Sequence, residues 1–377
     1  MRPRCDSGFS RPRSRSRDHS SRLVHVWKTS GEEAAAIPMD EAGRDIRALK
    51  QRLQRSCGLP RFRQRLLSNG MIWDDDAVIV SPMDFELELM PYAAASDEQV
   101  RQFFMAVGGG LAVEVEEILK RPQDPNLTNK SDTALLRASQ HGHGKVVQLL
   151  LEASADIHAY PSPPLPTPVE AAAEKGHADI VRILLEAGAN TEHSRCTRGE
   201  YGRTPLGLAC CEGHTSVVKL LLDAGADRRC TASWADEPAI ATAARSGHVE
   251  VVRLLLEAGD SPDTCIDGPY LWTPIGLAAR EGHAQVVRLL LEARADMDRR
   301  CIESTAHGFG QKLTPIGIAS RGGNPEITHL LLRAGANPDP NLECLPLHES
   351  DDDDDPFSDS EDCGDTETGQ SSGSETI

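Results

Sequence analysis

The chain has 377 residues, enough for about two or three structural units, and a formal net charge of −18. Residues 349–377 hold 12 acidic residues and neither Lys nor Arg, so the rest of the chain is only mildly acidic, which argues against general nucleic-acid binding. No apolar run approaches the roughly 20 residues that span a bilayer, and no apolar signal-peptide core is present. Ten scattered cysteines, two of them adjacent at 210–211, favour reduced thiols in an intracellular protein.

Residues 1–22 are basic and are predicted to be disordered. The Arg–Ser run from Arg13 to Arg17 has almost no apolar content, and such a segment cannot bury enough surface to fold. A solvated tail is the simplest interpretation, and an RNA contact, a nuclear role or a transit peptide stays open. We expect a cytoplasmic protein, with a nuclear location left open by this run.

Residues 23–92 are predicted to form a compact α+β unit. In chain order the patterns predict strands over 23–27 and 34–39, a helix over 45–55, a strand–turn–strand over 65–72 and a strand over 85–89. Ile46, Leu49 and Leu53 share one face of the helix, and Asn69-Gly70 favours a tight hairpin turn.

This order of elements resembles the ubiquitin-like β-grasp fold. Arg65-Leu66-Leu67 before the turn glycine is similar to the Arg-Leu-Ile segment of that family, which implies that Leu67 lies where family members expose an apolar patch. The di-glycine conjugation tail is absent, since residues 90–93 run on into the next unit, so the resemblance implies a docking module and not a modifier. The alternative is a small α+β cap with Leu67 packed in its core.

A phrase of glycine, histidine, apolar residues and a leucine run recurs along the rest of the chain. It begins at Gly142, Gly176, Gly213, Gly247, Gly282 and, loosely, Gly323, at intervals of about 34 to 41 residues that are typical of stacked repeats. The clearest units open with a Thr–Pro pair at 167, 204, 273 and 314, where Thr can cap a helix and Pro suits its first position. A short helix and a second helix with a broad apolar stripe follow, for example over 206–211 and 215–223, and stacked neighbours would bury that stripe.

Residue by residue, these units resemble the ankyrin repeat. The matching segments of one unit are Thr204-Pro205-Leu206, Gly213-His214, 217–222 and 224–227. The resemblance implies a mainly α fold, an ankyrin-type helical solenoid over residues 93–348 with about six or seven units, which the ubiquitin-like β-grasp domain precedes. The disordered basic segment 1–22 and a disordered acidic tail over 349–377 flank the two domains.

Some units depart from the family pattern. The units of Gly142 and Gly247 lack the Thr–Pro start, and Glu237-Pro238 is expected to replace it in the latter. The degenerate unit over 97–126 and the unit with Gly323-Asn324 are expected to cap the two ends. The usual His after Thr-Pro-Leu is missing, which removes a hydrogen bond at the helix start; its positions hold Glu170, Gly207, Gly276 and Gly317.

The connecting fingers between the units are one candidate partner site. They are longer than the family norm and hold nearly every aromatic residue of the array, and exposed aromatics are typical binding anchors. The candidate finger residues are Tyr160, Tyr201, Trp234, Tyr270 and Trp272. The alternative is local packing, above all for Trp272, which directly precedes Thr273-Pro274.

The short helices offer a second candidate site, the concave surface that ankyrin-like arrays generally use. The candidate residues of this short-helix face are Gln140, His141, Glu174, Lys175, Glu212, Arg245, Arg280, Glu281 and Arg321. Their mixed signs suit a protein partner better than a nucleic acid. The alternative is a plain solvated face.

We predict no catalytic residue, metal or cofactor. The histidines that follow the repeat glycines occupy one structural position in successive repeats and are too far apart to share a metal. The finger cysteines recur once per repeat, beyond the reach of one tetrahedral site, and lack a Cys-x-x-Cys pair: Cys196, Cys230, Cys265 and Cys301. The motifs of P-loops, α/β-hydrolases and zinc proteases are absent.

The chain is therefore expected to be a non-enzymatic scaffold or adaptor that binds a protein partner of unknown identity. A component of the ubiquitin pathway is suggested by fold analogy alone. One alternative is an inhibitor or masking chaperone that uses the repeats and the acidic tail, where Ser350 and Ser358 precede acids as acidophilic kinases favour. Another is a regulatory subunit of an enzyme complex in the ubiquitin pathway.

Overall fold

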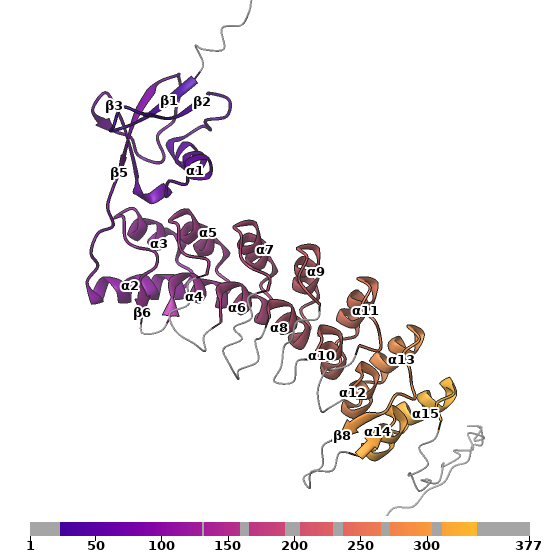
Figure 1. The fold of residues 1–377 in the computed structure, drawn as a ribbon. Helices are drawn as coiled ribbons and strands as arrows, with labels where there is room; N and C mark the ends of the chain where they lie inside the picture. Colours follow the sequence, from indigo (N-terminus) through magenta and orange to yellow (C-terminus); the bar gives the residue numbers. More distant parts are fainter. Residues whose placement is uncertain are drawn as a thin grey trace, which may run out of the picture. The chain divides into compact units, whose positions relative to one another are not determined.

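The computed structural model describes residues 23–129, 132–158, 166–192, 204–228, 237–264, 272–303 and 311–337. Within these ranges, a small sheet with one α-helix comes first and a series of helix pairs follows (Figure 1). The predicted basic segment 1–22 and acidic tail 349–377 lie outside the described residues.

The first unit is a mixed five-stranded sheet with one helix. Its elements are β1 (Leu23–Lys28), β2 (Glu33–Pro38), α1 (Ile46–Cys57), the 3-10 turn η2 (Arg61–Arg63), β3 (Gln64–Ser68), β4 (Met71–Ile72) and β5 (Asp84–Leu89). The strand order is β2-β1-β5-β3-β4, with β1 parallel to β5 and the other pairs antiparallel. The predicted strands and helix are confirmed, and this topology fits a β-grasp-like domain.

Alternation along the strands turns one face of this sheet onto α1. The buried residues that form its core include Val24, Val26, Leu66, Phe85, Leu87, Ile46, Leu49 and Leu53. The Asp45 side chain caps α1 by accepting from the Ala48 N–H, and Gly58 ends it at a φ of 68°. Asn69 and Gly70 both have positive φ between β3 and β4, as a two-residue hairpin turn requires.

The rest of the described chain is built from helix pairs. The first helices of the pairs are α2 (Asp97–Gly108), α4 (Ala134–Gln140), α6 (Pro168–Glu174), α8 (Pro205–Glu212), α10 (Ala239–Ser246), α12 (Pro274–Glu281) and α14 (Pro315–Arg321). The second helices are α3 (Ala112–Leu119), α5 (Gly144–Glu152), α7 (Ala178–Glu186), α9 (Thr215–Asp223), α11 (Val249–Glu257), α13 (Ala284–Glu292) and α15 (Pro325–Ala334). Each helix packs on the equivalent helices of the neighbouring repeats, so the array has two helical layers (Figure 1).

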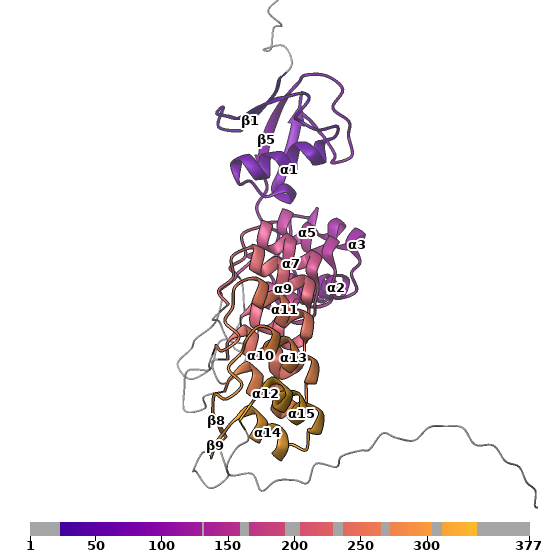
Figure 2. The same ribbon diagram turned by 90° about the vertical axis from the view of Figure 1, so that its right-hand side faces the viewer.

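In the described residues, two short hairpins connect neighbouring helix pairs. They are β6 (Thr128–Asn129) with β7 (Asp132–Thr133), and β8 (Cys301–Glu303) with β9 (Gln311–Leu313). The β8–β9 hairpin lies beside α14 (Figure 2). A continuous apolar core runs through the array from Phe103 to Ala336, as the predicted stripes require.

The predicted threonine caps are confirmed, and one further cap emerges. Each threonine before a first helix accepts a hydrogen bond from the backbone N–H three residues on: Thr133, Thr167, Thr204, Thr273 and Thr314. Thr133 thus caps the unit of Gly142 without a following proline. The expectation that Glu237-Pro238 replaces Thr–Pro is wrong, because Pro238 itself occupies the N-cap position and offers no side-chain acceptor.

Candidate partner-binding surfaces

A histidine precedes the second helix of each inner repeat and reaches back to the repeat before it. In each case the ring Nε2 lies 2.9–3.3 Å from a carbonyl oxygen: His143 with Gly108, His177 with Gln140, His214 with Glu174, His248 with Cys211 and His283 with Arg245. Since a carbonyl oxygen only accepts, Nε2 carries the hydrogen. Asn324 takes this role in the last repeat, where its Nδ2 lies 3.1 Å from the Ala279 carbonyl oxygen.

These contacts confirm that the recurring histidines hold one structural position. They tie the second helix of each repeat to the C-terminal end of the preceding first helix, which sets the spacing of the short-helix face. Within the described residues, no three His, Cys, Asp or Glu side chains gather where they could hold a metal ion. The histidines therefore fix the packing of neighbouring repeats. The exposed residues of the short-helix face take no part in these contacts, so they can differ between repeats.

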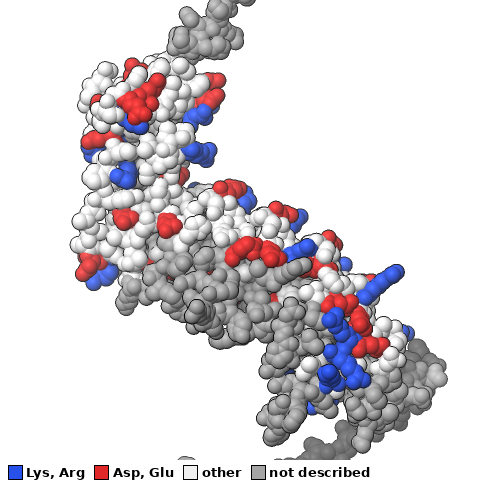
Figure 3. All heavy atoms as spheres, viewed as in Figure 1, with Lys and Arg blue, Asp and Glu red and all other residues white. Residues whose placement is uncertain are grey.

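The candidate residues of the short-helix face are accessible. Seven of the nine are exposed, and Glu174 and Arg245 are half-buried. The charged candidates are of mixed sign. Figure 3 shows side chains of both signs along the described part of the array. Accessibility is thus confirmed, and their binding role stays a prediction.

The residue two positions before each repeat glycine changes in character along the array. In chain order the series is Gln140, Glu174, Cys211, Arg245, Arg280 and Arg321. Arg245 forms an ion pair of 2.9 Å with Glu237, which is itself buried. The Arg280 guanidinium lies over the Trp272 ring, 5.2 Å from its centroid, and half of the side chain stays exposed.

Trp272 is buried and does not serve as an exposed finger anchor. Only 6% of its surface is accessible, and it packs in a small cluster with Ala241, Leu277, Cys301, Leu313 and Ile318. Trp272 therefore fits the alternative interpretation, in which the residue packs locally and is not an exposed binding anchor. The other finger candidates lie outside the described residues: Tyr160, Tyr201, Trp234 and Tyr270.

Leu67 lies on the open face of the β-grasp-like sheet, opposite the face that α1 covers. It pairs in register with Ile72 of β4 and with Glu86 of β5, which in turn pairs with Trp27 of β1. Leu67 is half-buried, while Ile72 is 60% and Trp27 38% exposed. The sheet therefore presents an apolar row with one acid in it, and the alternative that placed Leu67 in the core does not hold.

A buried arginine joins the β-grasp-like unit to the first two repeats. Arg61 is 1% exposed and forms ion pairs with Asp75 at 2.8 Å, with Glu116 of α3 at 2.7 Å and with Glu152 of α5. Burial alone would lower the pKa of Arg61, but these carboxylates outweigh it and raise that pKa, so the guanidinium stays charged. Burial likewise favours protonation of Asp75, yet Lys50 and Arg61 hold its pKa below the usual value.

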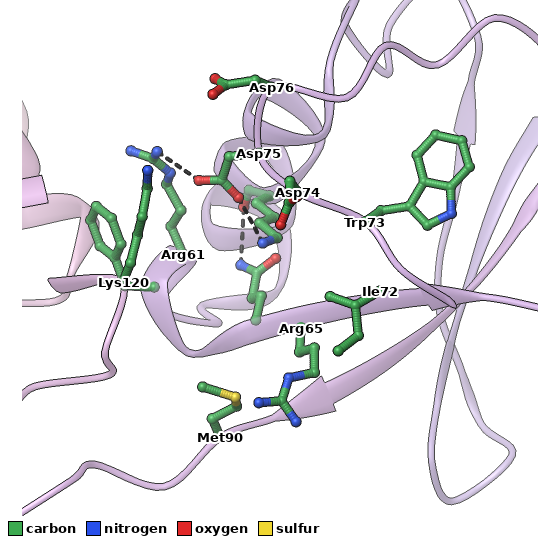
Figure 4. A pocket seen from close by; sticks show the side chains of 12 residues that line it. Arg61, Arg65, Ile72, Trp73, Asp74, Asp75, Asp76, Met90 and Lys120 are labelled. Atoms are coloured by element: carbon green, nitrogen blue, oxygen red, sulfur yellow. Dashed lines mark hydrogen bonds and ion pairs between the residues drawn. The ribbon is translucent and has the colours of Figure 1, made fainter. Parts of the chain in front are cut away.

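A hollow of about 460 Å³ lies beside this ion-pair group, as Figure 4 shows. In that view Asp75 points toward Arg61, and Trp73 is among the residues that line the hollow. The Gln64 amide donates to the carbonyl oxygens of Lys50 and Leu59, and its Oε1 is buried without a hydrogen-bond partner. Asp75 is the most buried of the three acids in this group and is already paired with two cations. We therefore interpret the group as a structural joint, in which Asp75 is not available as a general base.

Comparison with known proteins adds the family. Models of ankyrin repeats match residues 161–232, 228–301 and 277–332, and a single-repeat model matches residues 131–160. Among solved structures, the crystal structure of the human ASB11 ankyrin repeat domain is similar, with 23% sequence identity and a TM-score of 0.52. The similarity covers 63% of this chain and 99% of that domain, and shows the fold. No curated protein sequence matches the chain.

No helix in the described ranges is both long and apolar enough for a bilayer crossing. The family matches together cover residues 131–332, more than half of the chain. They coincide with the helix pairs from α4 to α15. In each pair a histidine, or Asn324 in the last pair, contacts a carbonyl oxygen of the preceding repeat. The chain belongs to the ankyrin-repeat family.

Proposed function

We propose that the protein is a non-enzymatic scaffold that binds a protein partner through its short-helix face, with the fingers contributing. The observation that carries this is the contrast between the two sides of the first helices. Their buried sides repeat the same small and apolar residues, while the residue directly before the repeat glycine changes from one repeat to the next in the units of Gly142 to Gly282: His141, Lys175, Glu212, Ser246 and Glu281. A rigid scaffold with position-specific exposed side chains is suited to protein recognition.

The test is capture of partners from a native lysate with the full chain as bait. One variant replaces the exposed residues Gln140, Glu212 and Arg280 by Ala, and a second replaces Tyr201, Trp234 and Tyr270. A matched control replaces Arg182, Lys219 and Arg253, which are exposed on the second helices. We expect the same partner with wild type and control, and its loss with the first variant or with both of the first two. Retention by all variants would contradict a site on either surface.

We propose further that the β-grasp-like unit is a second docking module, so that the protein acts as an adaptor. The row formed by the half-buried Leu67 with the exposed Trp27 and Ile72 supports this, because an apolar row on an open sheet face is a common feature of interaction sites. A ubiquitin-pathway component as its partner rests on the resemblance in topology. Binding of ubiquitin receptors should be lost in Leu67→Asp and kept in Val80→Asp, since Val80 is 81% exposed and lies outside the strands. Equal binding by both variants would contradict this role.

A further inference from the structure

The open face of the β-grasp-like sheet carries an acid in the middle of its apolar row. The register places four residues side by side across neighbouring strands: Trp27 of β1, Glu86 of β5, Leu67 of β3 and Ile72 of β4. We call these four residues the cross-strand row. Trp27, Glu86 and Ile72 are exposed, and Leu67 is half-buried. A partner that covers the apolar residues must therefore also cover the Glu86 carboxylate.

Glu86 has no cation of its own within the described part of the chain. The basic side chains of β1 and β3 are each occupied by another acid: His25 by Glu33 at 2.6 Å, Lys28 by Glu32 at 2.8 Å and Arg65 by Glu88 at 3.0 Å. The side chain of Glu86 makes neither an ion pair nor a hydrogen bond with any described residue. Because an unpaired carboxylate is costly to bury, a purely apolar partner surface would bind poorly here, and a partner that brings a cation would bind better.

The neighbours of Glu86 favour arginine as that cation. Trp27 stands beside Glu86 on the adjacent strand, at the spacing of about 4.8 Å that separates paired strands. The His25 ring stacks on Trp27 with a centroid separation of 6.2 Å and an angle of 19°, which holds the indole in place. A planar guanidinium can lie against an indole and donate two hydrogen bonds to a carboxylate at the same time, whereas the ammonium group of lysine lacks this fork of donors.

The spacing of the cross-strand row matches one face of an α-helix that lies across the strands. At about 4.8 Å per strand, the four positions of the row lie at roughly 0, 5, 10 and 14 Å. A helix rises about 1.5 Å per residue, so its first, fourth, eighth and eleventh residues share one face and lie at roughly 0, 4.5, 10.5 and 15 Å. Side chains on one face of an extended segment recur about every 6.6 Å, so they do not coincide with the row.

We propose that the cross-strand row binds an amphipathic helix of a partner protein, with an arginine at the second of these four positions and apolar residues at the other three. This inference rests on the proposed docking role of the β-grasp-like unit and names the class of partner. The arginine pairs with Glu86 and lies against Trp27. The terminal segments of the chain do not meet these requirements. The Arg–Ser run over 13–17 brings cations but no apolar residue, and residues 349–377 hold neither Lys nor Arg.

The probe is a fluorescent helical peptide of alanine and glutamine, with arginine at the fourth position and leucine at the first, eighth and eleventh. Two comparison peptides carry glutamine or glutamate in place of the arginine. Fluorescence anisotropy at low salt measures the binding of all three to the full chain and to its variants Glu86→Gln and Glu86→Arg. The matched control is Glu186→Gln, which removes the same charge from an exposed position of α7. Leu67→Asp tests the docking face itself.

We expect wild type and control to bind the arginine peptide on the order of 5-fold more tightly than the glutamine peptide, because an exposed ion pair and a cation–π contact each contribute a small factor. Glu86→Gln should bind these two peptides equally, and Glu86→Arg should prefer the glutamate peptide. High salt should reduce the preference of wild type. Leu67→Asp should weaken binding of the glutamine peptide, which relies on apolar contacts alone.

Equal affinity of wild type for the three peptides would overturn the inference, and so would no binding of any of them. Failure of the proposed docking role would look different, because the glutamine peptide would then bind wild type and Leu67→Asp equally. A variant with Arg13→Gln, Arg15→Gln and Arg17→Gln adds one further outcome. If only this variant prefers the arginine peptide, the basic segment 1–22 occupies Glu86 in the wild type, and the assignment of the row to a partner helix is wrong.

Discussion

The imidazole of His283 packs on the α-carbon of Gly247, the residue that ends α10, the first helix of the preceding repeat. A Cβ built on Gly247 would lie 2.6 Å from Nδ1 of that ring, and Gly247 also has a φ of 80°. The glycine is thus required twice, once by backbone conformation and once by the approach of the next repeat. The same pair recurs at each inner junction, for example between Gly176 and His214.

Gly247→Ala should therefore destabilise the array more than a positive φ alone explains. Gly335→Ala is the matched control, because Gly335 has a φ of 95° but nothing within 4 Å of its Cβ position. We expect about 1 kcal/mol for the control, from the left-handed conformation, and about 1–3 kcal/mol more for Gly247→Ala, from overpacking. Urea unfolding of both variants measures the difference, and equal costs would show that the ring moves aside freely.

The histidine ladder itself can be tested with the residue that replaces it at the last junction. His248→Ala leaves the Cys211 carbonyl oxygen without its donor and should cost about 1–3 kcal/mol. His248→Asn should recover part of this, because Asn324 donates to the Ala279 carbonyl oxygen from the equivalent position. The measurement is the urea midpoint of each variant at pH 7.5. Should the Asn variant be no more stable than the Ala variant, ring packing and not the hydrogen bond holds the repeats together.

Much of this architecture could be predicted because its signals are local. The helix expected over 215–223 is α9 itself, since a periodic apolar stripe is bounded on both sides by glycines. The order of strands around α1 followed from alternation and from the Asn69-Gly70 turn. In the array, the register at Pro238 was missed, because Glu-Pro resembles Thr-Pro locally while the helix begins one residue later, at Ala239.

The remaining errors and omissions concern contacts between distant residues. Trp272 is buried because Cys301 and Leu313 of the next repeat cover it, and Gly276 leaves room for Cys301: a Cβ there would lie 2.5 Å from the sulfur. The partners of Arg61 on α3 and α5 are 55 and 91 residues away, so no local pattern indicates them.

One residue of the array makes stability depend on pH. Asp260 stands where other repeats place a buried alanine, such as Ala226 and Ala295. Burial raises the pKa of Asp260, and Arg228, at 3.2 Å, offsets this only in part. Because the folded pKa lies above the unfolded one, ionisation of Asp260 opposes folding at neutral pH, and that penalty disappears as the pH falls through the folded pKa.

Asp260→Asn should accordingly stabilise the protein at pH 7, with a gain that shrinks toward about pH 4, near the usual pKa of an aspartate. Asp223→Asn, at an exposed position, is the control and should show no such trend. Chemical denaturation at several pH values gives both curves. A variant less stable than wild type at pH 7 would mean that the ion pair with Arg228 outweighs the cost of burial.

The joint around Arg61 should respond in the opposite direction to acid. The pKa of Asp75 is held low in the folded protein, so its contribution to stability is present above pH 4 and is lost as the pH falls through the folded pKa. Arg61→Met removes the cation and leaves Asp75, Glu116 and Glu152 close together, which should cost about 3–5 kcal/mol.

Arg65→Met is the matched control for this change. Arg65 pairs with Glu88 at 3.0 Å, but both side chains are more than a third exposed, so its removal should cost about 1 kcal/mol or less. Hydrogen exchange measured along α1, α3 and α5 locates the effect. Arg61→Met should raise exchange in all three helices, because Arg61 pairs directly with α3 and α5 and, through Asp75, is linked to Lys50 of α1. Faster exchange confined to α1 would show that the repeats hold their structure without this arginine, and that the ion pairs across the junction stabilise the β-grasp-like unit alone.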